Sequence, residues 1–193
     1  MGFFYFCKMK LFGERISFND SKEKFTVVIE PEKNGLVNSL MGAWLSMWLT
    51  IGVIVIWSLS ELKLKEQEQI ILYVFLVFWF YYAFRVSRSF LWLLYGKELV
   101  KIDEVSLTIK KSIKNYGQSV PYYFENIRDL KFEIPESNSL QSLWESSPWI
   151  NGGERLYFDY FDKVVRFGRK LNEKESQLLF NLIAKQIKER SKK

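Results

Sequence analysis

Side chains that perform acid–base, nucleophilic or metal chemistry are scarce in this chain. Its 193 residues include no histidine and a single cysteine, Cys7. This excludes a Ser-His-Asp or Cys-His triad, a His/Cys zinc site and an internal disulfide, because each requires histidine or a second cysteine. Asp159 and Asp162 could suggest paired catalytic carboxylates, but they flank a turn, where solvation at strand ends explains them better. No phosphate-binding loop, dinucleotide-binding glycine pattern or metal-ligand spacing is found, so we predict a protein without enzymatic activity, cofactor or metal.

A second group of distinctive residues lies within residues 135–154, which do not fit regular structure. This stretch contains two prolines, five serines and Gly152-Gly153, together with large apolar side chains. Long irregular segments of compact domains are commonly functional or disordered, and tryptophan is a frequent anchor at interfaces. Two interpretations remain open: a flap packed over the domain, or a loop that docks a partner or dips into a membrane. The candidate partner-binding residues are Trp144, Trp149 and Ile150.

The elements that must position these residues are dominated by two long apolar segments. Residues 36–60 are 25 residues without a charge. As a helix they rise about 37 Å, more than the roughly 30 Å hydrocarbon thickness of a bilayer. Their eleven Leu, Ile and Val residues favour insertion by roughly 3–7 kcal/mol. Core helices of soluble proteins seldom lack a polar face over so many turns, so this segment is predicted to cross a membrane.

The second apolar segment, predicted as a helix over residues 69–95, carries its first charges late. Residues 69–84 are uncharged and rise only about 24 Å, so a crossing helix must continue past Arg85 and Arg88. Both guanidinium groups can reach the headgroups while their stems stay in lipid. A buried ion or substrate site at the arginines is the less favoured alternative. The predicted membrane-interface residues are Arg85, Arg88, Trp92 and Lys97.

The distribution of charge predicts the orientation of this hairpin. The loop at residues 61–68 is short, which places both chain ends on one side of the membrane. Its only basic residues are Lys63 and Lys65, fewer than on the flanks, so both termini are expected in the cytoplasm. From Lys97 onward the chain has 18 basic and 14 acidic residues, a balance unlike a nucleic-acid-binding surface. The net charge of +6 therefore does not indicate a nucleic-acid partner.

Outside the apolar segments the chain alternates as β-strands do. Residues 14–18 and 24–30 predict a hairpin, which needs further strands because an isolated hairpin buries too little surface. The same alternation predicts later strands at residues 99–102, 105–113, 120–124, 127–134, 156–160 and 164–167. Asn172 and Glu175 form a capping box before an amphipathic helix at residues 173–190. Antiparallel strands followed by one such helix suggest a β-barrel whose open end the helix plugs.

Several short motifs, taken with the membrane hairpin, carry a resemblance to a known family. They are residues 29–34, Gly96-Lys97-Glu98, Leu107-Thr108-Ile109, residues 127–130, Phe158-Asp159-Tyr160, and Phe167-Gly168 with Leu171 and Glu175. In this order they resemble bacterial inner-membrane proteins with a pleckstrin-homology-like (PH-like) domain. The chain departs from that family at Phe161 and Ser176, where the family tends to have glycine and alanine. The resemblance implies an α+β membrane protein: a two-helix transmembrane hairpin inserted in a PH-like antiparallel β-barrel or sheet domain with a C-terminal capping helix.

The organisation implied for the chain has three parts. Residues 1–35 are a cytoplasmic segment with a β-hairpin, residues 36–95 the transmembrane hairpin, and residues 96–193 the cytoplasmic PH-like domain, in a bacterial inner membrane. A fold does not define an activity. Given the scarcity of catalytic groups, we expect a non-catalytic interaction module: an accessory subunit, assembly factor or scaffold for another membrane protein. The alternatives are an anionic-lipid or ligand-sensing regulatory domain, or an immunity-like inhibitor.

Overall fold

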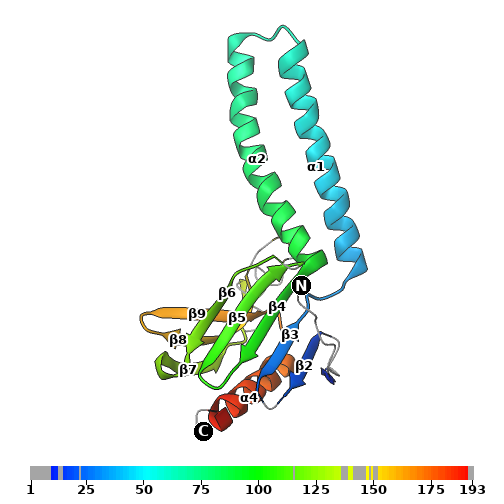
Figure 1. Cartoon of the computed structure of the whole chain (residues 1–193). Helices are drawn as coiled ribbons and strands as arrows, with labels where there is room; N and C mark the ends of the chain where they lie inside the picture. The colour runs from blue at the N-terminus through cyan, green and yellow to red at the C-terminus, as the bar shows by residue number, and fades with distance from the viewer. Residues whose placement is uncertain are drawn as a thin grey trace, which may run out of the picture. The chain divides into compact units, whose positions relative to one another are not determined.

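The computed structural model describes residues 10–12, 15–21, 23–114, 116–135, 139–140, 147, 149 and 152–190. They form two compact units, both visible in Figure 1. Lys33–Leu94 form one unit, which we call the helix hairpin. The described residues of Met1–Glu32 and Tyr95–Lys193 form the other, which we call the sheet unit. The helix hairpin is therefore an insertion between early and late segments of a β-rich unit.

The helix hairpin consists of α1 (Gly35–Glu61) and α2 (Glu66–Tyr95). These confirm the two long apolar helices predicted from the sequence. Asn34 caps α1 through its Oδ1, which accepts a hydrogen bond from the N–H of Val37 at 3.3 Å. Both helices are long and apolar enough to cross a membrane, and only 11% of the most apolar 18-residue window of each is buried inside the molecule.

The larger sheet of the sheet unit, sheet A, joins strands from both sides of the insertion. Its antiparallel strands follow the order β1-β2-β3-β4-β5-β6. In β3 and β4, Phe25 lies opposite Ile102 and Ile29 lies opposite Glu98, so early and late strands pair directly. The strands are β1 (Lys10–Phe12), β2 (Ile16–Asp20), β3 (Phe25–Ile29), β4 (Gly96–Ile102), β5 (Ser106–Ile113) and β6 (Ser119–Tyr123). Of these, β1 was not predicted.

A smaller antiparallel sheet, sheet B, contains the later strands and is followed by a helix. Its strands are β7 (Ile127–Phe132), β8 (Glu154–Tyr160) and β9 (Lys163–Arg169). Helix α4 (Glu173–Arg190) matches the predicted range. The capping box is also confirmed, because the Glu175 N–H donates to Asn172 Oδ1 at 2.8 Å and the Asn172 N–H donates to Glu175 Oε2 at 3.0 Å.

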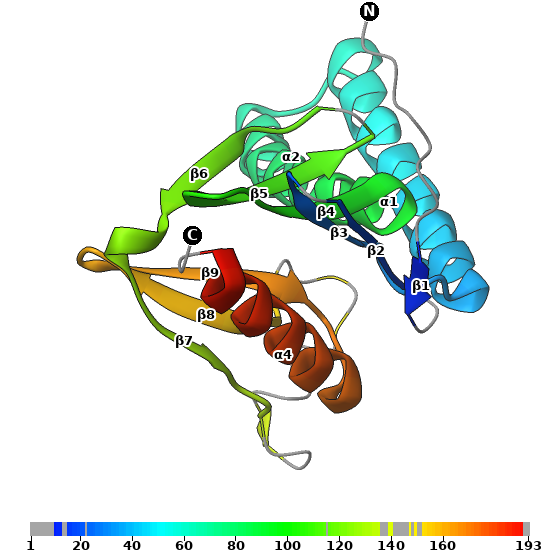
Figure 2. The same cartoon turned by 60° about the horizontal axis from the view of Figure 1, so that its bottom comes forward.

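The strands do not close into the barrel that the sequence suggested. A 3₁₀ turn, η1 (Phe124–Asn126), separates β6 from β7, and no strand pairing joins sheets A and B among the residues that the structure describes. Figure 2 shows the sheets as separate layers, with α4 along sheet B. Leu179 and Ile183 of α4 are fully buried in a core shared with both sheets. Helix side chains thus cover apolar surface that further strand pairing would cover in a closed barrel.

Candidate functional site

Two tryptophans hold α1 against α2 inside the helix hairpin. Trp48 Nε1 donates a hydrogen bond to the carbonyl of Trp79 at 3.3 Å, and Trp79 Nε1 donates to the carbonyl of Trp48 at 2.8 Å. Because the bonds are reciprocal, each indole N–H finds its partner on the other helix. Gly52 permits this approach, since a Cβ at that position would overlap the Trp79 indole. Small residues have the same role at helix crossings in membranes.

Four hydroxyl groups of α1 bond to the backbone of the same helix. Ser46, Thr50 and Ser58 each donate to the carbonyl four residues earlier, at 2.9, 2.9 and 2.8 Å. Ser60 donates to the carbonyl of Trp57 at 2.8 Å. Such bonds leave these side chains without a need for water, which is the condition that a bilayer imposes.

Three of the four predicted membrane-interface residues share one face of α2. Arg85, Arg88 and Trp92 are spaced i, i+3 and i+7, and Tyr81 lies one turn before them. Arg85 Nη1 donates to Tyr81 Oη at 2.7 Å, and its guanidinium carbon lies 6.0 Å from the centroid of that ring. Both arginines are exposed. Their role at a membrane interface stays a prediction.

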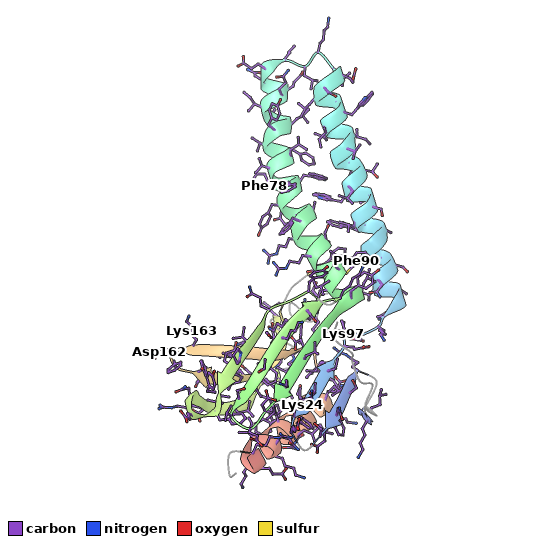
Figure 3. All side chains as sticks on the ribbon, viewed as in Figure 1. Lys24, Phe78, Phe90, Lys97, Asp162 and Lys163 are labelled. Atoms are coloured by element: carbon purple, nitrogen blue, oxygen red, sulfur yellow. The ribbon has the colours of Figure 1, made fainter. Side chains whose placement is uncertain are left out.

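Lys97, the fourth predicted interface residue, belongs to the sheet unit. It is the second residue of β4, directly after the end of α2 at Tyr95. Its Nζ forms an ion pair with Glu30 Oε1 at 3.1 Å. Its charge is therefore matched within the sheet unit, and Figure 3 labels it at the beginning of the strand.

Of the three predicted partner-binding residues, only Trp149 lies among the described residues, and it is partly buried. Trp144 and Ile150 lie outside the described residues. The carbonyl of Ser147 accepts a hydrogen bond from Lys170 Nζ at 2.6 Å. This bond ties Ser147 to the connection between β9 and α4, while the role of the stretch in partner binding stays a prediction.

The two aspartates considered for catalysis lie at the connection of β8 and β9. Asp159 is paired in register with Val164, and Asp162 is an exposed residue of the turn, labelled with Lys163 in Figure 3. Among the described residues, no group of three or more His, Cys, Asp or Glu side chains could hold a metal ion.

A buried carboxylate that the sequence analysis missed links the two sheets. Glu98 of β4 is 1% exposed, and its Oε2 accepts the N–H groups of Gly168 at 2.7 Å and Arg169 at 3.2 Å in β9. Its Oε1 faces Lys111 Nζ at 3.8 Å. Lys111 also donates to Glu154 Oε1 at 2.9 Å, so one lysine of sheet A lies between a glutamate of each sheet.

The electrostatic environment separates these two glutamates. Burial raises the pKa of Glu98 above its ordinary value, and Lys111 and the two backbone N–H groups only partly oppose this. Burial acts in the same direction on Glu154, but there the hydrogen bond and charge of Lys111 prevail and lower its pKa. Glu98, Lys111 and Glu154 therefore form a structural connection between the sheets. Lys111 compensates the charge of Glu154 well and that of Glu98 only in part.

A signal for Glu98 was present in the sequence. Glu98 shares the alternation of Val100 and Ile102, so it lies on the same face of β4, and both of these neighbours are fully buried. A charged residue in phase with a core face predicts a buried ionic contact. Its partners in β9 could not be identified, because they lie 70 and 71 residues away in the chain.

Comparisons with known proteins return no relative. No family model, curated protein or solved structure matches this chain.

Proposed function

We propose that this chain is a membrane-anchored interaction module without catalytic activity. In this proposal α1 and α2 cross a lipid bilayer side by side, and the sheet unit lies on one side of it. The observation that carries the proposal is the inverted polarity of the helix hairpin. Large apolar side chains such as Ile54 and Phe78 face outward, while the two indole N–H groups are bonded between the helices.

A soluble helical hairpin would be organised in the opposite way. Its apolar side chains would form the contact between the helices or pack against a sheet, and polar side chains would face water. Here the exposed side chains of both apolar windows require an apolar surrounding, because contiguous exposed apolar surface of this extent marks an interaction or membrane surface. Lipid tails satisfy this requirement along the whole length of both helices.

The strand register supports a crossing that returns to its starting side. Because β3 and β4 are neighbours in sheet A, the chain leaves and re-enters the same unit around the hairpin. The connecting loop has two basic residues, fewer than its flanks, which favours the cytoplasm for the sheet unit. Antiparallel sheets and a C-terminal helix are compatible with a PH-like domain, so we include that domain type and a bacterial inner membrane in the proposal.

For the partner we propose another membrane protein, with the chain as accessory subunit, assembly factor or scaffold. Three observations support this: the scarcity of catalytic side chains, the outward apolar faces of two helices, and a tryptophan, Trp149, that is only partly buried. Crosslinking in intact membranes, followed by purification in mild detergent, is expected to isolate one defined partner. A monomer under every such condition would contradict this part of the proposal.

Cysteine labelling of the full chain tests the topology. With Cys7→Ser as background, single substitutions Lys24→Cys, Lys163→Cys and Lys63→Cys are treated with a membrane-impermeant maleimide in sealed vesicles of both orientations. We expect Lys24→Cys and Lys163→Cys, both labelled in Figure 3, to react from one side and Lys63→Cys from the other. Reaction of the first two from opposite sides, or a chain that stays in solution without detergent, would overturn the proposal.

A further inference from the structure

The turn between β5 and β6 is fixed against the last residue of α2. The N–H of Lys114 donates to the carbonyl of Tyr95 at 2.9 Å. Ile113 and Tyr116 form an isolated antiparallel bridge with hydrogen bonds of 2.9 and 3.1 Å in the two directions. Tyr95 and this turn therefore lie at the same end of the neighbouring strands β4 and β5.

The described residues of the turn combine a left-handed backbone at Lys114 with an exposed aromatic side chain at Tyr116. Lys114 has a φ of 55°, in the left-handed region that non-glycine residues rarely adopt. Gly117 lies so close to the backbone of Lys111 that a Cβ would overlap it. In this frame Tyr116 is 86% exposed. A strained backbone that holds a large side chain out of the core indicates a functional constraint.

The chemistry of the turn is that of a membrane–water interface. Lys114 Nζ lies 4.7 Å from the centroid of the Tyr95 ring, and no carboxylate among the described residues pairs with it. Lys97, at the same end of β4, differs from Lys114 because its charge is paired with Glu30. Tyrosines prefer the headgroup level of a bilayer, and a lysine there is attracted by anionic lipid.

We propose that the β5–β6 turn is a second membrane contact, in which Tyr116 lies among the lipid headgroups and Lys114 faces their phosphates. This inference rests on the proposed membrane crossing, because the end of α2 marks where the membrane surface lies. The sheet unit is then attached at two places, by the helices and by the turn. In this proposal the two attachments determine which end of strands β4 and β5 faces the bilayer.

Labels at the two ends of β6 test this arrangement. In the Cys7→Ser background, an environment-sensitive fluorophore is placed at Gln118→Cys beside the turn or at Tyr123→Cys at the far end. The sites are five residues apart, about 16 Å along an extended strand. The full chain is reconstituted in vesicles of phosphatidylcholine and phosphatidylglycerol that contain a headgroup nitroxide. We expect the nitroxide to quench most of the fluorescence at residue 118 and little at residue 123.

A paired substitution separates attachment from mere proximity. In the Gln118→Cys chain, Lys114→Gln with Tyr116→Ser is expected to lower the quenching, because the turn loses both of its headgroup contacts although the backbone bond of residue 114 to Tyr95 is kept. The matched control makes the same chemical changes at exposed residues elsewhere, Lys163→Gln with Tyr123→Ser, and is expected to leave the quenching unchanged. Equal quenching at residues 118 and 123, or quenching that Lys114→Gln with Tyr116→Ser does not lower, would overturn the inference.

A third label distinguishes this inference from the proposed function. Val53→Cys lies on the outside of α1 and should be quenched by a nitroxide on the lipid acyl chain. If this label is quenched and residue 118 is not, the helices cross the membrane and only the second contact is wrong. If the label at residue 53 is not quenched, the membrane crossing itself is wrong.

Discussion

The helix hairpin and the sheet unit place the same residue types in opposite positions. Phe78 of α2 is 61% exposed, whereas Phe158 of β8 is fully buried. Val53 of α1 and Val27 of β3 differ in the same sense. Apolar side chains move away from water wherever they can, and the proposed membrane crossing would account for this inversion. Aromatic and aliphatic content alone would not distinguish them, because both units are rich in these residues, whereas the absence of charge over residues 36–60 and 69–84 does.

The two units also satisfy their polar groups at different ranges along the chain. In α1 the hydroxyl groups of Ser46, Thr50 and Ser58 bond four residues back. In the sheet unit, Glu98 bonds the N–H of Gly168, which is 70 residues away. A helix in lipid can satisfy its own polar groups before it packs, whereas a buried charge in a sheet depends on the completed fold.

Removal of the Glu98 carboxylate is expected to give the largest effect, confined to the sheet unit. Glu98→Ala leaves the buried N–H groups of Gly168 and Arg169 without their acceptor. We expect a loss of about 3–5 kcal/mol in the free energy of unfolding of this unit. The measurement is denaturant-dependent hydrogen exchange of β8 and β9 peptides from the full chain in mild detergent. The exchange of α1 and α2 should not change.

Glu98→Gln is the matched control, because it keeps an acceptor oxygen without the charge. It should cost less than half as much as Glu98→Ala. It should also remove a pH dependence: burial raises the pKa of Glu98, so the native state binds more protons than the unfolded state just above the ordinary value of 4.5. Stability of the wild-type unit is therefore expected to fall as pH rises through that window. Equal losses for both variants would contradict a role of the oxygen as acceptor.

Substitution of Gly52, the glycine beside Trp79, is expected to destabilise the helix hairpin and not the sheet unit. In Gly52→Ala the new methyl group overlaps the indole, and we expect a loss of about 1–3 kcal/mol in helix–helix packing. Unfolding in mixed micelles of increasing SDS content, followed by tryptophan fluorescence, measures it. Gly42→Ala is the control, since its Cβ would lie 3.4 Å from Phe90 Cζ, an ordinary contact. If both variants behave alike, Gly52 is not the point of close approach.

Deprotonation of Lys170 should change the stability of the sheet unit only. Burial, with the charges of Arg169 and Arg15, lowers the pKa of Lys170 to about 8. Between about 8 and the ordinary 10.5 the unfolded state binds more protons, so stability of the sheet unit should rise with pH in this range. Lys170→Met should abolish the rise, and Lys174→Met on α4 should retain it. Hydrogen exchange of β9 at fixed denaturant reports the difference, and a rise that persists in Lys170→Met would exclude this lysine as its origin.

Substitution of Ser176 is expected to give a smaller change, a gain in the stability of the sheet unit. Its Oγ is buried at the start of α4 and has no hydrogen-bond partner in the described part of the chain. Ser176→Ala removes this unpaired hydroxyl and is expected to stabilise the sheet unit by about 1 kcal/mol. Ser112→Ala is the control, because Ser112 Oγ is also buried but donates to the carbonyl of Lys97 at 3.4 Å. Chemical denaturation should show opposite signs for the two serines.

The smallest expected effect concerns Phe161 in the turn between β8 and β9. Its φ of 53° lies in the region that favours glycine, although its ring contacts that of Tyr160 with centroids 4.9 Å apart. Phe161→Gly relieves the backbone strain but adds chain entropy to the unfolded state, so we expect a gain of at most about 1 kcal/mol. Phe161→Ala keeps the strain and loses the ring, and its unfolding midpoint should fall below that of the wild type. A glycine variant less stable than the alanine variant would contradict the argument.

Several elements could be predicted because their signals are local. The ends of α1 follow from the limits of its charge-free segment, and the start of α4 follows from Asn172 and Glu175. Helix α2 extends beyond its charge-free segment at both ends, from Glu66 to Tyr95. The need of the early hairpin for partner strands predicted that early and late strands belong together, and the structure shows that β3 pairs with β4. The predicted barrel was wrong because alternation identifies strands but not which strands pair across a break such as η1.

The candidate site was less predictable for the same reason. Arg85, Arg88 and Trp92 share a face because helix geometry determines it, whereas the environment of Glu98 and the contact of Lys114 with Tyr95 depend on strand register. Of the predicted partner-binding residues, Trp149 alone has a described position.

By itself the sequence determined the length and apolar character of two helices, the strand alternation, and the cap of α4. Each of these depends on residues within a few positions of one another. The tertiary structure alone decided that Trp48 bonds Trp79, that Glu98 joins two sheets, and that the β5–β6 turn lies against the end of α2. These contacts link distant segments, and their geometry exists only once helix packing and strand register bring the segments together.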